Sequence, residues 1–474
     1  MLAIVAAKAM RGGALPLAIN YKTGPGGYLL IAPFVLAFGE TLRALRVASV
    51  FWGAACVAAT GVLAERCSGS RRAGVLAACV AAVTPALSAW MPMGMYAHIP
   101  NTALVAAALA EMIACARDRS PRRARLAGLL LGLALATHSV AAGIVVGLVV
   151  FALLNRERFG PSERRLVGQG AAFFAAPLLP YLWALSVGGL WRYWPMHLIV
   201  RDDDHRLSNL AYFPSLLVRA RQLFCIAAPS VGWGAPSRAL LSAAGAACAA
   251  GLLGAALWAF VRVEPRARGA ARFLWTLCAC FFLLSPFTPS RLHAPHLLMA
   301  MPVLWAAVAA SLALEVSGLA RRTGVLLVCA YLAAGGAVTV FKVRSEARDG
   351  DAGGDDALAI VDMGRYFAAR PELAPAIVTD SDEFGAMMIR FLSGRVPPVL
   401  KTGSSTPAGD AEWKTALGNP GSVFVVPVSD SEEPDHEEPA RRRAARDGYS
   451  LVETDVLRDG LGAPAYRLLA ARSR

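Results

Sequence analysis

The chain has 474 residues, of which 56% are hydrophobic and only 17% are charged, and its mean hydropathy is +0.49. An ordinary soluble domain has about 45–50% apolar and about 25% charged residues. The apolar excess lies in long runs. It excludes a water-soluble enzyme, a disordered scaffold and a nucleic-acid-binding module as first interpretations, and it predicts a polytopic membrane protein.

The net charge of +14 is divided unevenly along the chain. Residues 1–341 hold 30 Lys and Arg and 11 Asp and Glu, a net of +19, whereas residues 342–474 hold 17 and 22, a net of −5. The positive charge therefore belongs to the apolar part, where it orients the chain in the membrane rather than binding nucleic acid. We predict a transmembrane domain at residues 1–341 and an extracytoplasmic α/β domain at residues 342–474.

Eight apolar segments are long enough to form membrane-spanning helices. They lie at residues 44–64, 73–90, 99–116, 166–187, 237–261, 273–288, 297–315 and 322–341. Short arginine-rich connections alternate with others that are rich in aromatic residues, histidine and proline. Because cytoplasmic loops carry the excess of Lys and Arg, the other connections should face outward. The sequence thus predicts a multi-pass protein of the cytoplasmic (inner) membrane, with its C-terminal domain outside the cytoplasm.

One further apolar segment, residues 126–154, tests this assignment. It is flanked by arginine on both sides, by Arg125 before it and by Arg156, Arg158, Arg164 and Arg165 after it. A single span would place four arginines outside and invert every later loop. We therefore predict two short helices broken around residues 137–139, forming a hairpin that returns to the cytoplasmic side without fully crossing. His138 lies in this break, where a buried histidine with satisfied hydrogen bonds is the simplest interpretation.

After Phe341 the pattern becomes that of a small soluble domain that follows a polar linker at residues 346–356. Helices are predicted at 356–370, 381–394 and 439–448, and strands at 376–380, 422–428, 449–457 and 465–471. This alternation predicts an α/β domain. No glycine-rich phosphate loop follows any of the strands.

The candidate functional residues lie in the outward-facing connections. Lys22 stands beside Tyr21 in a glycine- and proline-rich turn just before an apolar helix, where a lysine and free backbone N–H groups suit a lipid phosphate. The alternative is an interfacial lysine that extends to the headgroups. Tyr96 and His98 lie in a tight outward turn and suit the lining of a sugar cavity, with an aromatic belt as the alternative.

The longest outward connection holds the only carboxylate cluster on that side of the apolar region, Asp202 to Asp204. Such carboxylates suit a general base that activates an alcohol, or a divalent-metal site. Arg201 is a candidate substrate-binding residue; with Arg206 it also offers the alternative of a solvated, salt-bridged loop. We assign Asp202 and Asp203 as candidate catalytic residues and expect no metal site.

A fourth connection, residues 285–302, brings Arg291 and His293 to the point where a helix re-enters the membrane from outside. Arg291 suits a phosphate diester of the substrate, with a lipid headgroup as the alternative partner. No nucleophile elbow, Walker loop, HExxH or GxGxxG motif appears. From these residues alone, we can predict only a polytopic membrane protein whose outer face suits the binding of phosphate and sugar.

Taken in order, several segments resemble the GT-C glycosyltransferases, in the bacterial branch related to protein O-mannosyltransferases and to the lipid A aminoarabinose transferase. The similar segments are residues 2–69, with Lys22 and Pro25 in a turn followed by Phe38-Gly39 and Leu45-Arg46, the hairpin at residues 128–148, and the late outward turn at residues 290–309. The resemblance implies a mainly α, GT-C-like helical bundle of about eight spans plus the hairpin, with a small C-terminal α/β domain.

The resemblance also implies a hexosyl- or pentosyltransferase that moves a sugar from a polyprenyl-phosphate donor to a lipid, glycan or protein acceptor outside the cytoplasmic membrane. Lys22 would hold the donor phosphate with help from Arg291. An outer carboxylate would act as general base on the acceptor hydroxyl. The lipid-linked sugar is then a substrate, the bilayer is a partner, and no cofactor is expected.

The sequence departs from the family at its start. In the family the acidic catalytic residue lies in the first outward loop after a first span, and here Met1 falls at about that point. We expect that the recorded start omits this span and acid, with a non-catalytic, degenerate relative as the alternative. A transporter or flippase fits the sequence less well, because the charges lie in loops and no two similar halves are evident.

Overall fold

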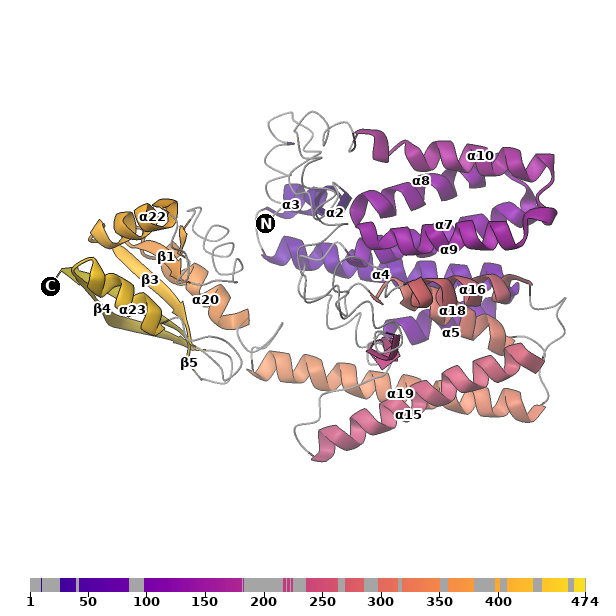
Figure 1. Ribbon diagram of the computed structural model, residues 1–474. Helices are drawn as coiled ribbons and strands as arrows, with labels where there is room; N and C mark the ends of the chain where they lie inside the picture. The colour runs from indigo at the N-terminus through magenta and orange to yellow at the C-terminus, as the bar shows by residue number, and fades with distance from the viewer. Residues whose placement is uncertain are drawn as a thin grey trace. The chain divides into compact units, whose positions relative to one another are not determined.

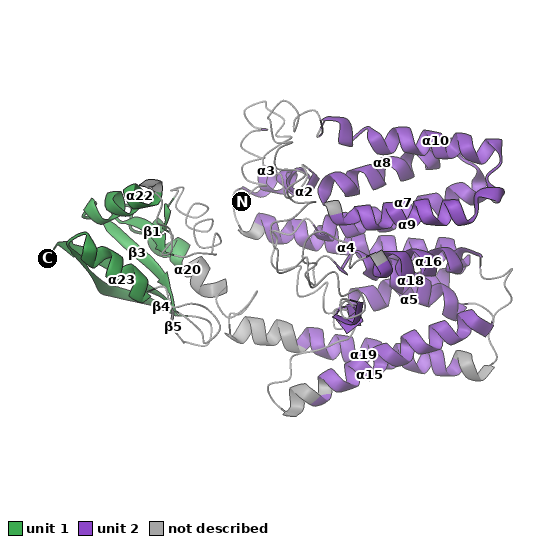
Figure 2. Cartoon of the chain, in the orientation of Figure 1, with its two compact units in different colours: residues 1, 343–474 green, residues 2–342 purple. Residues whose placement is uncertain are grey.

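The structure is a computed structural model. It describes residues 10, 26–39, 42–84, 98–180, 182, 216–218, 220–221, 223–224, 236–262, 269–284, 297–313, 318–349, 357–378, 397–400, 407–428, 437–458 and 464–473. The chain divides into two compact units, residues 2–342 and residues 343–474, coloured purple and green in Figure 2. Each unit has its own hydrophobic core.

The first unit is a bundle of α-helices (Figure 1). In the described residues it contains α2 (Gly26–Leu29), α3 (Ala32–Phe38), α4 (Leu42–Ser68), α5 (Arg71–Ala82), α7 (His98–Asp118), α8 (Pro121–Thr137), η1 (Ser139–Ala141), α9 (Ala142–Leu154), η2 (Arg156–Arg158), α10 (Pro161–Ala175), α15 (Pro236–Arg262), α16 (Gly269–Leu284), α18 (Ala300–Ala313) and α19 (Gly318–Asp349). Each of the eight predicted spans contains or overlaps one of these helices, although α5 ends at Ala82, inside the span predicted at residues 73–90. The predicted helical bundle is therefore confirmed.

Four of these helices are long and apolar enough to cross a membrane, judged by length and composition over the described residues. They are residues 44–68 in α4, 98–118 in α7, 242–262 in α15 and 322–340 in α19. α9, α16 and α18 are also apolar but shorter. The total of eight spans therefore stays a prediction.

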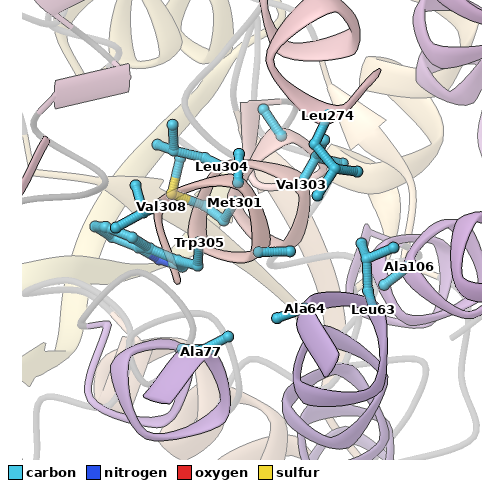
Figure 3. Close-up of a cluster of buried hydrophobic side chains, with 14 of the residues drawn as sticks. Leu63, Ala64, Ala77, Ala106, Leu274, Met301, Val303, Leu304, Trp305 and Val308 are labelled. Carbon is cyan, nitrogen blue, oxygen red and sulfur yellow. The ribbon is translucent and has the colours of Figure 1, made fainter. Parts of the chain in front are cut away.

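Helix α18 lies at the centre of the bundle. Its residues from Ala300 to Ser311 are all buried, as expected for a helix that is apolar on every side. It packs against α4, α5, α15 and α16. Figure 3 shows its side chains among residues of the neighbouring helices, such as Leu63, Ala77 and Leu274. Small residues let these helix backbones approach closely.

The apolar segment 126–154 is broken where the charge pattern predicts. α8 ends at Thr137, and His138 has extended backbone angles (φ −156°, ψ 132°) before η1 leads into α9. Gly128 of α8 lies against Gly170 of α10, and Gly132, one turn later, lies against Phe174. The two contacts advance in the same direction along both helices, so α8 and α10 run parallel. Both helices therefore begin at the same end of the bundle: the chain leaves this end through α8 and returns to it through α9, as the predicted hairpin.

Arginine-rich connections meet at this end, which we call the arginine-rich end. Arg119, just before α8, pairs with Glu163 at the start of α10 at 3.0 Å. Glu111, near the end of α7, pairs with Arg66 of α4 at 2.6 Å and with Arg123 of α8 at 3.1 Å. These ion pairs place the connections after α4, α7 and α9 on one side, in agreement with the positive-inside rule.

Replacing Glu111 by glutamine is expected to destabilise the bundle by roughly 1–3 kcal/mol, because Arg66 and Arg123 lose a shared, largely buried carboxylate. Thermal unfolding of the detergent-solubilised protein measures this loss. Glu438→Gln is the matched control, since Glu438 and Arg442 are both exposed and 3.7 Å apart. Equally small changes in both variants would show that Glu111 does not hold the helix ends together.

The second unit contains a five-stranded mixed sheet in the order β2-β1-β3-β5-β4. β1 (Ala374–Val378) pairs in parallel with β2 (Val399–Leu400) and β3 (Ser422–Pro427), whereas β5 (Pro464–Ser473) pairs antiparallel with β3 and with β4 (Tyr449–Arg458). Because side chains alternate along a strand, the sheet has two apolar faces. α22 (Pro407–Gly418) and α23 (Glu437–Arg446) cover one face and α20 (Ala357–Ala368) covers the other.

Most of the predicted elements of this unit are confirmed, by α20, β1, β3, α23, β4 and β5. β2 and α22 were not predicted. The linker predicted from residue 346 is wrong for residues 346–349, because α19 continues to Asp349; Glu346, Ala347 and Arg348 are good helix formers, and the first glycine comes at residue 350. The helix predicted at 381–394 lies outside the described residues.

Candidate functional site

The end of the bundle opposite the arginine-rich end carries the turn α2, which directly follows the lysine-containing segment. A Cβ atom on Gly26 would lie 2.4 Å from Thr137 Oγ1 and 3.0 Å from Thr137 Cα, so the backbone approaches the end of α8 as closely as only glycine allows. The indole N–H of Trp52 on α4 donates to the carbonyl of Leu30 at 3.2 Å, and Tyr28 is buried. The turn is thus held against both α8 and α4.

The Phe38-Gly39 pair marks the end of α3. Gly39 has φ +79°, a left-handed conformation that costs glycine little and other residues more. The ring of Phe34 on α3 packs 5.3 Å from that of Phe51 on α4. The glycine therefore lets the chain leave α3 and enter α4, while the aromatic contact keeps the two helices together.

Two histidines meet beside α2. His98 begins α7 and His138 follows α8; their ring centroids are 4.3 Å apart, and both residues are only 8% exposed. The backbone N–H of Val140 donates to His138 Nδ1 at 3.2 Å. Because Nδ1 accepts this bond, the neutral His138 ring carries its proton on Nε2. The break in α8 thus presents one imidazole, in a defined tautomer, to the first turn of α7.

Asn101, one turn into α7, links these two segments. Its Nδ2 donates to the carbonyl of His138 at 3.1 Å, and the residue is 1% exposed. Its Oδ1 is buried and accepts no hydrogen bond from the described residues. Polar groups are costly in an apolar bundle and mark functional places there. We call this set, which lies at the end predicted to face outward, the outer-end cluster: His98, Asn101, Thr102, Thr137 and His138.

The outer-end cluster has the chemistry of a binding site for a polar ligand. Imidazoles both donate and accept hydrogen bonds. Asn101 Oδ1 is an acceptor suited to a hydroxyl or an amine. Within the described part of the chain, no group of three His, Cys, Asp or Glu side chains is placed to hold a metal ion.

Of the site residues predicted from the sequence, the structure describes His98, which lies at the end of the bundle where the loop pattern placed it. The other candidates lie outside the described residues: Tyr21, Lys22, Tyr96, Arg201, Asp202, Asp203, Arg291 and His293. Their roles stay predictions.

Sequence reasoning missed Asn101 and Gly26 as members of the site, and it gave His138 only a packing role. An asparagine near the start of an otherwise apolar helix was an available signal for Asn101. The contact of Gly26 with Thr137 joins segments far apart along the chain, and only the tertiary structure reveals it.

The N-terminal third of the chain matches a known family. Residues 22–183 match the family model described as dolichyl-phosphate-mannose-protein mannosyltransferase. The matched segment begins at Lys22 and contains both α2 and the whole outer-end cluster. A search of curated proteins gives no significant match.

Two solved structures share the fold over nearly the whole chain. ArnT from Cupriavidus metallidurans in the apo state has a TM-score of 0.66 and 13% sequence identity. ArnT from the same organism bound to undecaprenyl phosphate has a TM-score of 0.63 and 14% sequence identity. Both alignments cover 99% of this chain and 92% of the ArnT chain. The predicted architecture is therefore confirmed for the fold: the chain has the fold of the ArnT structures, a helical bundle followed by a small sheet domain.

Proposed function

We propose that the protein is a membrane glycosyltransferase. It takes a sugar from a polyprenyl-phosphate donor and passes it to an acceptor on the side opposite the arginine-rich end. Two comparisons support a lipid-phosphate donor. The matching family model is named for dolichyl-phosphate-mannose, and one of the similar ArnT structures is bound to undecaprenyl phosphate.

The contact between α2 and the end of α8 is the observation that carries this proposal. Lys22 precedes Gly26 by four residues, so the length of the chain keeps the Lys22 Cα within about 14 Å of the Gly26 Cα. Gly26 in turn touches Thr137, a member of the outer-end cluster. A lysine ammonium is a compact charge suited to phosphate, and we propose that Lys22 acts together with this buried cluster of sugar-compatible groups.

Each part then has a role in the transfer. Lys22 neutralises the donor phosphate, assisted by Arg291, while His98 and Asn101 hydrogen-bond the sugar. The acceptor oxygen attacks the anomeric carbon and forms the new C–O bond, and the bond from that carbon to the phosphate oxygen breaks. The lipid phosphate leaves with the electron pair. Asp202 or Asp203 takes the proton of the acceptor hydroxyl.

Binding of the lipid phosphate tests the proposal without knowledge of the sugar. Undecaprenyl phosphate should raise the melting temperature of the purified protein in detergent in a concentration-dependent way, because a ligand that binds only the folded state stabilises it. Undecaprenol, which lacks the phosphate, is the matched control and should have little effect. Equal effects of the two lipids would contradict a donor site for a lipid phosphate.

Asn101→Leu is expected to reduce sugar transfer roughly 10- to 100-fold, because it removes a buried donor and a buried acceptor from the outer-end cluster. Transfer of label from undecaprenyl-phosphate-linked sugars measures the rate. Thr60→Val is the matched control: Thr60 is also fully buried, and its hydroxyl donates to the carbonyl of Cys56 within α4 at 2.7 Å. A similar loss in both variants would assign Asn101 to packing alone.

A further inference from the structure

A compact basic turn lies at the arginine-rich end, where η2 links α9 to α10. The backbone N–H of Phe159 donates to the Arg156 carbonyl at 3.1 Å, and Arg164 Nε donates to the Phe159 carbonyl at 3.2 Å. Arg156, Arg164 and the adjacent Arg165 are all exposed. We call this segment, residues 153–167, the α9–α10 turn. It gathers three arginine side chains around one short loop.

The acidic residues near the turn leave this charge largely uncompensated. Glu163 accepts a hydrogen bond from the Ser162 hydroxyl at 2.8 Å and pairs with Arg119 at 3.0 Å. The Ser162 hydrogen bond, a backbone N–H and Arg119 together lower the pKa of Glu163, which favours its charged form. Residues 117–125 and 156–165, which this ion pair joins, hold nine arginines against three acidic residues, a net of +6.

Among the described residues, no carboxylate lies within ion-pair distance of Arg156, Arg164 or Arg165. The acid next to them that is not engaged with Arg119 is Glu157, which is exposed. Three exposed arginines therefore lie at this turn, where Glu157 is the one carboxylate not paired with Arg119. Their planar, forked donors match the oxygen atoms of a phosphate.

Exposed apolar side chains adjoin these arginines. On the last turn of α9, Leu153 is 64% and Leu154 is 72% exposed, and Val167 on α10 is 56% exposed. In a helical membrane bundle, such side chains face lipid acyl chains. A phosphate-binding group beside an acyl-facing surface is suited to an anionic phospholipid rather than to a soluble anion.

We propose that the α9–α10 turn binds an anionic phospholipid of the leaflet at the arginine-rich end. Arg156, Arg164 and Arg165 hold the phosphate groups, and the acyl chains lie along Leu153, Leu154 and Val167. This binding site is separate from the outer-end cluster, because α8 and α9 run between the two ends of the bundle.

The start of α5 provides an internal comparison. Arg71 and Arg72 also open a helix at the arginine-rich end and are exposed. There, however, the Glu65 carboxylate lies against the next turn of α5, with its Oε2 3.3 Å from the position of a Cβ on Gly74. The start of α5 thus offers a phosphate two arginines beside a carboxylate, against three arginines at the α9–α10 turn, so it should bind an anionic lipid less well.

Native mass spectrometry of the detergent-solubilised protein, titrated with cardiolipin, tests this inference. Arg164→Gln with Arg165→Gln should weaken cardiolipin binding about 25-fold, about fivefold for each arginine. Arg71→Gln with Arg72→Gln removes the same charge from the start of α5 and should change it less than threefold. Arginines at residues 117–125 remain in both variants, which preserves the charge bias that orients the chain.

The lipid added distinguishes the possible ligands. Phosphatidylethanolamine, which has no net charge, and inorganic phosphate, which has no acyl chain, should each bind far more weakly than cardiolipin. Equal losses of cardiolipin affinity in the two double variants would show that only general charge attraction is at work, and would contradict a specific site at the α9–α10 turn. If inorganic phosphate bound as tightly as cardiolipin, the ligand of the turn would be a soluble anion and the lipid proposal would be wrong.

Discussion

Lys22→Ala is expected to reduce sugar transfer at least about 100-fold, since removing one preorganised charge from a developing phosphate commonly costs that much. The leaving lipid phosphate gains negative charge as the sugar departs, and Lys22 is the cation tethered to α2. Initial rates with an undecaprenyl-phosphate-linked sugar measure the loss. The loss should appear in kcat as well as in the KM for the donor, because the charge is greater in the transition state.

Two matched variants make the Lys22 result interpretable. Lys22→Arg keeps the charge and should retain much more activity than Lys22→Ala, although its different shape should lower the rate. Lys414→Ala removes an exposed lysine from α22 in the second unit and should leave the rate unchanged. Full activity of Lys22→Ala would remove this lysine from the mechanism while leaving the fold assignment intact.

Gly26→Ala is expected to lower sugar transfer about 5- to 100-fold, because a displacement of about 1 Å near the reacting groups can cost about 100-fold in rate. The added methyl group would lie 2.4 Å from Thr137 Oγ1, so α2 must shift, and the lysine turn before it must shift too. Transfer rate and donor KM should both change. The melting temperature should change less, since α2 is a short element at one end of the bundle.

A second substitution tests the stated cause of this loss. Thr137→Ala removes the hydroxyl that meets the new methyl group, so the double variant should recover part of the rate lost in Gly26→Ala; the Thr137 backbone, at 3.0–3.1 Å, stays close and limits the recovery. Gly254→Ala is the control, because nothing lies within 4 Å of a Cβ at that position. It should be neutral or slightly stabilising, by at most about 1 kcal/mol. An equal loss from Gly254→Ala would rule out the Thr137 contact as the cause.

The helical framework was predictable because burial and charge act on whole segments. Each apolar run of spanning length became a helix, and the break at His138 followed from arginines on both flanks of one run. That inference needed no structure, since four arginines cannot easily be moved across a bilayer. The exact ends of helices were less predictable. Helix α19 continues beyond the end of its apolar run, because the residues that follow the run are good helix formers.

The outer-end cluster was only partly predictable, because its members are brought together by packing. His98 could be singled out as a polar residue in an outward turn. The proximity of His138, the bond from Asn101 to the His138 carbonyl and the Gly26–Thr137 contact all join segments that are distant in sequence. The spacing of residues along a single helix predicts contacts within that helix and not contacts between distant segments. Loop assignment placed His98 at the end of the bundle opposite the arginine-rich end, and the three-dimensional structure identified the residues that surround it.

The glycine contacts between α8 and α10 also imply an order of assembly. A Cβ on Gly128 would lie 2.0 Å from the Gly170 carbonyl oxygen, so the two backbones touch. α8 is synthesised before α10, and it can pair with α10 only after η1, α9 and η2 have been made. The pairing of α8 with α10 is therefore a late, non-local step. A bulky residue at Gly128 should leave the chain with α8 inserted in the membrane but not paired with α10.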